Sequence, residues 1–318
     1  MSQKLNTTQG AISEMHKVGQ DKRERAKTTL VTLERKKAKK EKVVAVTAYT
    51  YPEALLADRA GVDIVLVGDS LGMTTLGYRT TIAVTMEDMI SHCRGVWRAN
   101  KKAMQIGDMP FMSYQPSNEI AIKNAGRFLQ EGGCDAVKIE GAMIDRVKAI
   151  ADSGIVVMSH LGLTPQTRAL LGGYRVQGKT KSDVDKILEQ AVALQDAGCR
   201  LLLLEAVPRE SAAYIAANLA IPVYGIGAGE MVDGQLVIMH DLIGMFFEFK
   251  SKFVKRYCEV GKLIEESLAL YADEVRMGTF PSQENCYEIN DGELEKLLAD
   301  PKWKYVTEEK GATLPHAC

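Results

Sequence analysis

The chain has 318 residues, of which 46% are hydrophobic and 25% charged, enough to bury a large core in one big domain or two smaller ones. Its net charge of −1 gives no overall field that would attract nucleic acid, so we expect no such partner. No run of about 18 apolar residues occurs, so we also expect no membrane-spanning segment.

The beginning of the chain is basic. Residues 1–42 carry 12 Lys or Arg and 5 acidic residues, a net of +7. A run of this kind predicts a solvated, partly disordered arm, and contact with an acidic surface or nucleic acid is the alternative. We assign residues 1–27 to this basic extension.

From Val43 onward, short apolar runs alternate with segments of helical periodicity. The predicted strands cover residues 43–49, 64–68, 103–107, 136–139, 155–159, 201–204, 223–226 and 236–239. The predicted helices cover residues 52–60, a segment starting after Thr85, 118–130, 143–152, 182–197 and 210–218, and Ser182 is expected to cap its helix.

About eight strands separated mostly by helices predict an α/β fold of the (β/α)8 barrel type over residues 28–275. An open doubly wound sheet is the alternative, but no G-x-G-x-x-G opens the first helix. The amphipathic segment 252–271 is predicted to close the barrel as an outer helix. Residues 276–318 are then a C-terminal tail, which could pack on a neighbouring subunit.

Four of the apolar runs end in an acid: Asp69, Asp108, Glu140 and Glu205. A barrel gathers such strand ends at one face, and a carboxylate is costly to bury alone. The repetition predicts a shared site around a divalent cation, with Mg²⁺ favoured because it prefers oxygen ligands. The alternative for Asp69 or Asp108 taken singly is a cap on the following turn.

Two further side chains, Lys138 and His160, belong to this face, and Glu205 has a role of its own there. Lys138 and Glu140 are two residues apart on a strand, so both should point inward, either as an internal ion pair or with Lys138 on a substrate carboxylate. His160 follows the next strand and could orient an acid or simply cover the site. Glu205 ends the most apolar strand, which suits a general base.

The sequence resembles the ketopantoate hydroxymethyltransferase family over roughly residues 28–285. The motifs that carry the resemblance occur in the family's order: V-G-D-S-L-G-M (67–73), V-K-I-E-G (137–141), H-L-G-L-T-P-Q (160–166), G-G-Y-R-V-Q-G-K (172–179), G-I-G-A-G (225–229), K-F-V-K-R-Y (252–257) and F-P-S-Q-E (280–284).

The resemblance implies a Mg²⁺-dependent barrel of the phosphoenolpyruvate/pyruvate superfamily, assembled as a homo-oligomer, a decamer in this family. It implies transfer of a hydroxymethyl group from 5,10-methylenetetrahydrofolate to 3-methyl-2-oxobutanoate, a step of pantothenate biosynthesis. Residue by residue, it implies that Asp69 and Asp108 bind the metal and the substrate, and that Glu140 contacts the metal directly or through water. Ser70, Lys138 and His160 would contact the 2-oxo acid, and Glu205 would be the catalytic base.

The chain departs from the family pattern at the barrel mouth. Thr50 stands where the family has Asp, Ala206 where it has Cys, and residues 245–249 replace a loop with Gly and Pro. These changes leave the preferred side chain of the 2-oxo acid open.

Two other functions compete with this one. One is a Mg²⁺-dependent 2-oxo acid aldolase or lyase that needs no folate. The other is a non-catalytic paralogue, although the loss of an acid expected of a paralogue is not seen.

Six scattered cysteines without a C-x-x-C pair are typical of reduced thiols and favour a cytoplasmic location. The Lys-rich beginning contains acids, which is poor for a mitochondrial presequence but leaves that location open.

Overall fold

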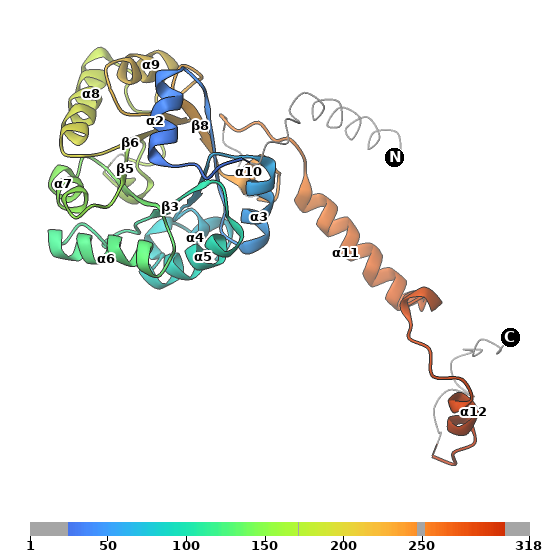
Figure 1. Ribbon diagram of the computed structural model, residues 1–318. Helices are drawn as coiled ribbons and strands as arrows, with labels where there is room; N and C mark the ends of the chain where they lie inside the picture. The colour runs from blue at the N-terminus through green and yellow to red at the C-terminus, as the bar shows by residue number, and fades with distance from the viewer. Residues whose placement is uncertain (1–24, 171, 247–251, 303–318) are drawn as a thin grey trace. The chain divides into compact units, whose positions relative to one another are not determined.

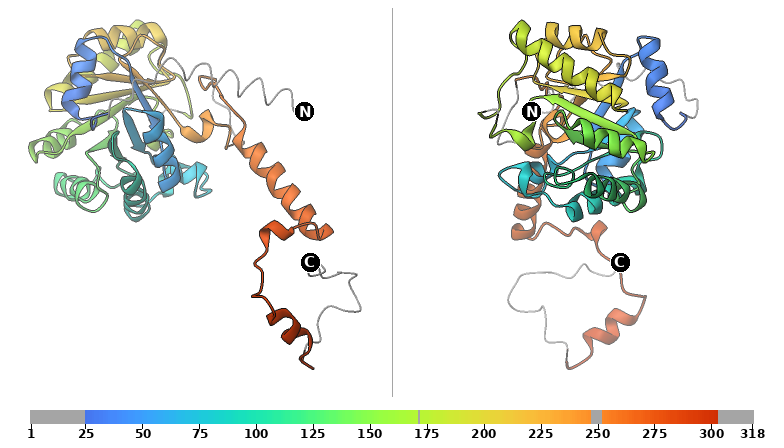
Figure 2. Two further views of the ribbon diagram at one scale, coloured as in Figure 1. Left: turned by 45° about the vertical axis from the view of Figure 1, so that its right-hand side comes forward. Right: turned by 90° about the vertical axis from the view of Figure 1, so that its left-hand side faces the viewer.

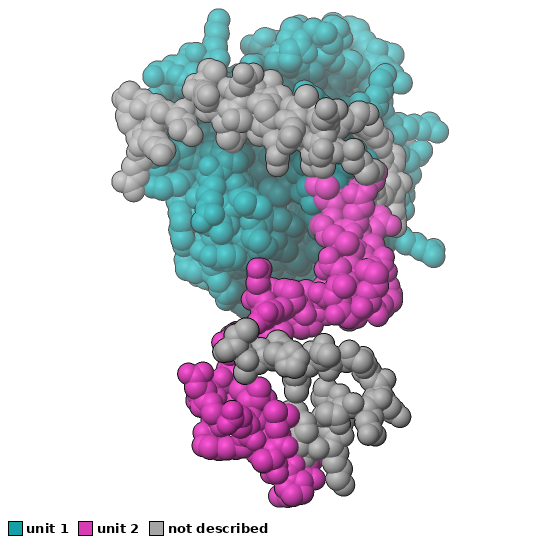
Figure 3. All heavy atoms as spheres, turned by 90° about the vertical axis from the view of Figure 1, so that its right-hand side faces the viewer, with its two compact units in different colours: residues 1–261 teal, residues 262–318 magenta. Residues whose placement is uncertain are grey.

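The computed structural model describes residues 25–170, 172–246 and 252–302. The chain divides into two compact units, Met1–Gly261 and Lys262–Cys318, which are coloured separately in Figure 3. Most of the predicted basic extension, residues 1–24, lies outside the described part, as do residues 247–249 of the altered loop.

The first unit contains a closed barrel of parallel strands in the order β1 to β8 (Figures 1 and 2). The predicted barrel is confirmed, and the open sheet is wrong because β1 pairs with β8 from Val43 to Val46. The strands are β1 (Val43–Thr47), β2 (Ile64–Val67), β3 (Met104–Asp108), β4 (Ala136–Glu140), β5 (Val157–Gly162), β6 (Leu201–Glu205), β7 (Val223–Ile226) and β8 (Gly234–Val237).

Helices connect the strands on the outside of the barrel (Figure 2). Five of the helices described in this unit start at a hydroxyl cap, and Thr85, before the helix predicted to follow it, forms a capping box with Asp88. The predicted cap Ser182 is wrong, because Thr180 caps that helix by accepting a bond of 3.2 Å from the Asp183 amide. The helices of this unit are α2 (Leu30–Ala38), α3 (Tyr51–Ala60), α4 (Leu71–Thr74), α5 (Met86–Ala99), α6 (Asn118–Gln130), α7 (Ile144–Asp152), α8 (Lys181–Asp196), α9 (Arg209–Ala217) and α10 (Met239–Leu242), with 3₁₀ turns η1 (Thr81–Ala83) and η2 (Pro165–Thr167).

Helix α2 corrects the expectation for the basic arm. Its Leu33 is fully buried and packs with the apolar side chains inside the barrel. Lys36 pairs with Asp63 at 2.7 Å and Lys37 with Asp233 at 2.8 Å, and these two acids precede β2 and β8. The prediction of a solvated arm is therefore wrong for residues 30–38, because their charges neutralise acids at the amino-terminal ends of the strands.

The segment after the barrel also differs from expectation. Helix α11 (Val260–Met277) begins eight residues later than the predicted start at Lys252, and none of its residues is buried. Most of α11 belongs to the second unit, so its closing of the barrel as an outer helix stays a prediction, while Val254 in the first unit is buried. The second unit continues with η3 (Gln283–Asn285) and α12 (Glu293–Leu298). Within the described ranges, no helix combines the length and apolar character needed to cross a membrane.

Candidate active site

Three acids meet at the carboxyl-terminal end of neighbouring strands. Asp69 follows β2, Asp108 ends β3 and Glu140 ends β4, and one carboxylate oxygen of each lies within 4.8 Å of the others. All three side chains are buried. The strand register explains the convergence, since Asp108 is paired with Lys138 on β4, and Glu140 with His160 on β5. The structure thus brings together three of the four acids that the sequence predicts to share a site, and Glu205 is not among them.

Lys138 lies between two of these acids. Its Nζ is 2.8 Å from both oxygens of Asp108 and 3.2 Å from Oε1 of Glu140. Burial alone would lower the pKa of Lys138, but the surrounding carboxylates outweigh it and raise this pKa. Lys138 therefore stays charged in a space almost closed to water.

The third acid has no such partner. Asp69 forms no ion pair within 4 Å with any residue in the described ranges, and it accepts a bond of 3.0 Å from the side chain of Gln166. Burial, together with the charges of Asp108 and Glu140, raises the pKa of Asp69 well above its ordinary value. The three buried carboxylates make a donor set of hard oxygens, and Asp69 has no cationic partner among the described residues, which fits a divalent cation.

His160 stands between Glu140 and Glu205. Its Nδ1 is 3.3 Å from Oε1 of Glu140, and its Nε2 is 3.3 Å from Oε2 of Glu205, although the second contact is not directed as a hydrogen bond. Burial and the charge of Lys138 lower the pKa of His160, but the hydrogen bond and charge of Glu140 outweigh them and raise it to about 9. The imidazole thus connects the acidic cluster to Glu205.

Glu205 differs from the other acids in its access to solvent. Its side chain is 16% exposed, against 1% for that of Glu140. The dry, apolar setting expected from its strand is therefore only partly present, because the carboxylate extends past the end of β6. A group at this position can reach a molecule that sits in the barrel mouth.

Ser70 faces the same space. Its Oγ is 2.8 Å from the hydroxyl of the buried Tyr49, and it makes no capping bond to α4, so the hydroxyl is directed away from the helix. A Cβ added to Gly68 would lie 2.9 Å from Ser70 Oγ and 3.8 Å from Asp108 Oδ2. The serine hydroxyl and the Asp108 carboxylate therefore border one small volume, and only glycine leaves it open.

Two residues that the sequence patterns did not single out complete the centre. Gln166 lies in η2 within the H-L-G-L-T-P-Q motif, and Tyr114 lies in the loop after β3; both are buried. The Tyr114 hydroxyl donates to Oε1 of Gln166 at 2.7 Å. Their positions in loops gave no periodic signal, and only the placement of Gln166 just past a strand end pointed to this face.

Backbone geometry fixes the position of Glu205. Gly162 is its register partner on β5, and the Leu163 amide donates to the Glu205 carbonyl at 2.9 Å. Gly162 has a φ of +89°, and a Cβ there would lie 2.4 Å from that carbonyl oxygen. Only glycine allows β5 and β6 to approach this closely.

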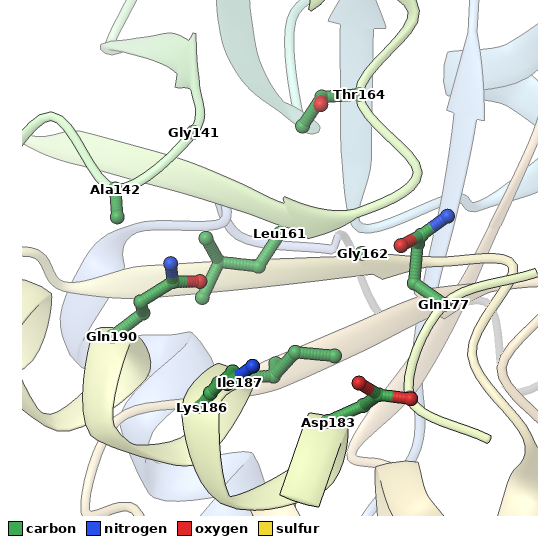
Figure 4. Close-up of a pocket in the computed structure, with 11 residues that line it drawn as sticks. Gly141, Ala142, Leu161, Gly162, Thr164, Gln177, Asp183, Lys186, Ile187 and Gln190 are labelled. Carbon is green, nitrogen blue, oxygen red and sulfur yellow. The ribbon is translucent and has the colours of Figure 1, made fainter. Parts of the chain in front are cut away.

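A groove of about 280 Å³ adjoins the site (Figure 4). Gly141, Leu161 and Gly162 line one side, next in sequence to Glu140 and His160, and α8 contributes Asp183 and Ile187 on the other. None of the four acids lines it. The groove therefore borders the acidic cluster without containing it.

One of the departures at the barrel mouth has a local structural role. Thr50, where the family has Asp, caps α3, with its hydroxyl accepting from the Glu53 amide at 3.4 Å and Glu53 bonding back to the cap. Ala206 takes a left-handed φ of +48° directly after Glu205. Neither change removes a carboxylate from the site.

Comparison with known proteins agrees with this geometry. A family described as ketopantoate hydroxymethyltransferase matches residues 27–283. A 3-methyl-2-oxobutanoate hydroxymethyltransferase from Moorella thermoacetica is 50% identical over 267 residues, which is 83% of this chain and 99% of that protein. A protein of the same name from Syntrophomonas wolfei is 48% identical over 274 residues, which is 86% of this chain and 99% of that protein.

Solved structures share the fold. A phosphonopyruvate hydrolase aligns with a TM-score of 0.54 at 10% identity, covering 85% of this chain and 94% of that one. A phosphoenolpyruvate phosphomutase from Streptomyces platensis aligns with a TM-score of 0.52 at 15% identity, covering 77% of this chain and 88% of that one. A parallel barrel with polar and acidic groups gathered at its carboxyl-terminal end is the architecture of a barrel enzyme. This chain belongs to the ketopantoate hydroxymethyltransferase family, and it is accordingly a hydroxymethyltransferase.

The close approach at Gly162 leads to a first prediction. Gly162→Ala should lower kcat for hydroxymethyl transfer by about 10²-fold, because the added methyl group displaces the end of β6 and with it Glu205. The matched control is Gly126→Ala in α6, where a Cβ meets nothing within 4 Å. The control should keep its kcat and gain about 0.5–1 kcal/mol of unfolding free energy. Steady-state kinetics and urea denaturation measure both, and a wild-type kcat in Gly162→Ala would contradict the prediction.

Proposed function

We propose that this enzyme uses Mg²⁺ and 5,10-methylenetetrahydrofolate to hydroxymethylate 3-methyl-2-oxobutanoate, forming ketopantoate for pantothenate biosynthesis. The observation that carries the proposal is the set of three buried carboxylates within 4.8 Å of one another, in a chain of this family. The absence of a described cationic partner for the buried Asp69 supports a divalent cation, and the oxygen donors favour Mg²⁺ over softer metals.

Asp69 and Asp108 would hold the metal, with Glu140 as a direct ligand or as a partner of a bound water. When bound, Mg²⁺ would polarise the keto group of the substrate, an effect worth several kcal/mol. In support, Asp69 lacks any described cationic partner, whereas Asp108 and Glu140 already share Lys138. The site is thus short of positive charge on the side of Asp69.

The remaining groups would act on the 2-oxo acid itself. Ser70 and Lys138 would bind its carboxylate and keto oxygen, and the Lys138 charge would stabilise the negative charge that develops there. Glu205 would remove the proton from C3, which would then bond the methylene carbon of the folate. The bonds from that carbon to the two folate nitrogens would break, water would supply the hydroxyl group, and tetrahydrofolate would leave. His160 would hold Glu140 and Glu205 in their relative positions, which its 3.3 Å contacts to both support.

The alternative is a Mg²⁺-dependent aldolase or lyase that acts on 2-oxo acids without folate. The observation that favours this alternative is the fold that the chain shares with a phosphonopyruvate hydrolase. A non-catalytic paralogue is disfavoured because Asp69, Asp108 and Glu140 lie within 4.8 Å of one another and Lys138 pairs with two of them.

A reconstituted assay tests the proposal. Purified enzyme should form ketopantoate from 3-methyl-2-oxobutanoate only when both Mg²⁺ and 5,10-methylenetetrahydrofolate are present, and added EDTA should stop the reaction. Product is measured by mass spectrometry, with other 2-oxo acids supplied in parallel to define the alkyl group preferred. Cleavage of 2-oxo acids in the absence of folate would favour the lyase instead.

The base is tested separately from the metal. Glu205→Gln should lower kcat by about 10²–10⁴-fold, because the amide cannot accept the C3 proton. It should also stop exchange of that proton with D₂O, followed by NMR, while Mn²⁺ binding survives. Glu210→Gln is the matched control, since Glu210 follows the same strand and its side chain is 77% exposed. If Glu205→Gln exchanged the C3 proton with D₂O at the wild-type rate, Glu205 would not be the base.

We further propose that the enzyme works as a homo-oligomer. The second unit supports this, because α11 leaves large apolar side chains open to solvent, including Leu268 at 62%, Tyr271 at 54% and Met277 at 68%. Apolar surface of this kind marks interaction sites. Sedimentation velocity should give a mass several times that of the 34.9 kDa chain, and Leu268→Asp should reduce it. A single species of monomer mass across the micromolar range would contradict the proposal.

A further inference from the structure

Gln166 is a neutral, buried residue that donates hydrogen bonds to two of the three clustered acids. It is 2% exposed and held in the 3₁₀ turn after β5. Its side-chain Nε2 donates to Asp69 Oδ2 at 3.0 Å, and its backbone amide donates to Glu140 Oε2 at 3.0 Å. One residue therefore holds two of the three carboxylates.

The orientation of the Gln166 amide is determined by its neighbours. The Tyr114 hydroxyl lies 2.7 Å from Oε1, and the carbonyl oxygen of Met109 lies 3.0 Å from Nε2. A carbonyl accepts only, so Nε2 must be the NH₂ end, and Tyr114 then donates to the oxygen. Both hydrogens of the NH₂ group are used, one on Met109 and one on Asp69.

Tyr114 connects this bond back to Glu140. Its hydroxyl accepts from the Glu140 backbone amide at 3.1 Å while it donates to Gln166. The three residues thus form a closed ring of hydrogen bonds. The Glu140 backbone amide donates to the Tyr114 hydroxyl, this hydroxyl donates to the Gln166 side-chain oxygen, and the Gln166 backbone amide donates to the Glu140 carboxylate. The ring leaves the Glu140 carboxylate little freedom to turn, and Gln166 holds Asp69 from the same fixed position.

We infer that Gln166, supported by Tyr114, is a positioning residue that presets Asp69 and Glu140 for the divalent cation. The inference rests on the proposed metal site. Partners that orient ligands typically change metal affinity about 10–100-fold when they are lost. Because Asp69 has no other described side-chain donor, its direction depends on the glutamine more than that of Asp108, which Lys138 holds with two bonds.

The test uses Gln166→Met, which keeps the approximate shape and removes the donor. Without substrate, the dissociation constant for Mn²⁺, measured by electron paramagnetic resonance, should rise about 10–100-fold. The Mg²⁺ concentration for half-maximal activity should rise in parallel, with kcat recovering at saturating Mg²⁺. Loss of a merely structural residue would not be reversed by added metal.

The chain offers a matched control in Gln105. It is equally buried, at 1% exposure, but its Nε2 donates to the carbonyls of Cys93 and Gly132 at 3.1 and 3.2 Å, away from the acids. Gln105→Met should lower thermal stability and leave Mn²⁺ binding unchanged. Tyr114→Phe is the second variant, which keeps the ring and should weaken Mn²⁺ binding less than Gln166→Met.

The outcomes separate this inference from the proposed function. If the wild type binds Mn²⁺ and makes ketopantoate, but folded Gln166→Met binds Mn²⁺ as tightly, only the positioning role is wrong. If Gln166→Met does not fold, unchanged Mn²⁺ binding by Tyr114→Phe overturns it in the same way. If the wild type binds no divalent cation, both the proposed metal site and the positioning role of Gln166 are wrong.

Discussion

The burial of three carboxylates around Lys138 is the constraint on which the rest of the site depends. Moving several like charges out of water is expensive, and one ammonium group offsets only part of the cost. Lys138 is bonded to Asp108 and Glu140, whereas the side-chain donor to Asp69 in the described part of the chain is the neutral Gln166. Burying Asp69 without a charged partner costs stability, and a cation at the proposed metal site would offset that cost.

The barrel explains how so many charges can be brought together at all. Register places Asp108 beside Lys138 and Glu140 beside His160, so each of these two acids has a basic partner on the next strand. Rigid strand ends then fix the distances, and loops supply only the finer contacts. At the opposite end, α2 performs a similar neutralisation, with Lys36 on Asp63 beside β2. Both ends of the barrel thus depend on charges matched across neighbouring elements.

The sequence revealed those parts of the site that follow from strand periodicity. Acids at the ends of apolar runs, and Lys138 two residues from Glu140, could be placed on one face because strands alternate with period two. Gln166 and Tyr114 could not, because their positions depend on loop conformations that no periodicity specifies. Helix α2 was missed for a different reason: its lysines resemble a solvated arm until Asp63 and Asp233 are known to lie opposite them.

The different exposure of the four acids bears on how their roles divide. A metal ligand benefits from burial, since exclusion of water strengthens its attraction to the ion. A base must instead reach a substrate carbon and release its proton between turnovers, which requires contact with the barrel mouth. Glu140 is 1% exposed and Glu205 16%, and His160 lies between them at 3.3 Å from each. The same imidazole can therefore hold one acid in the closed interior and another at its boundary, and the depth of each carboxylate below the mouth is what distinguishes a proposed ligand from a proposed base.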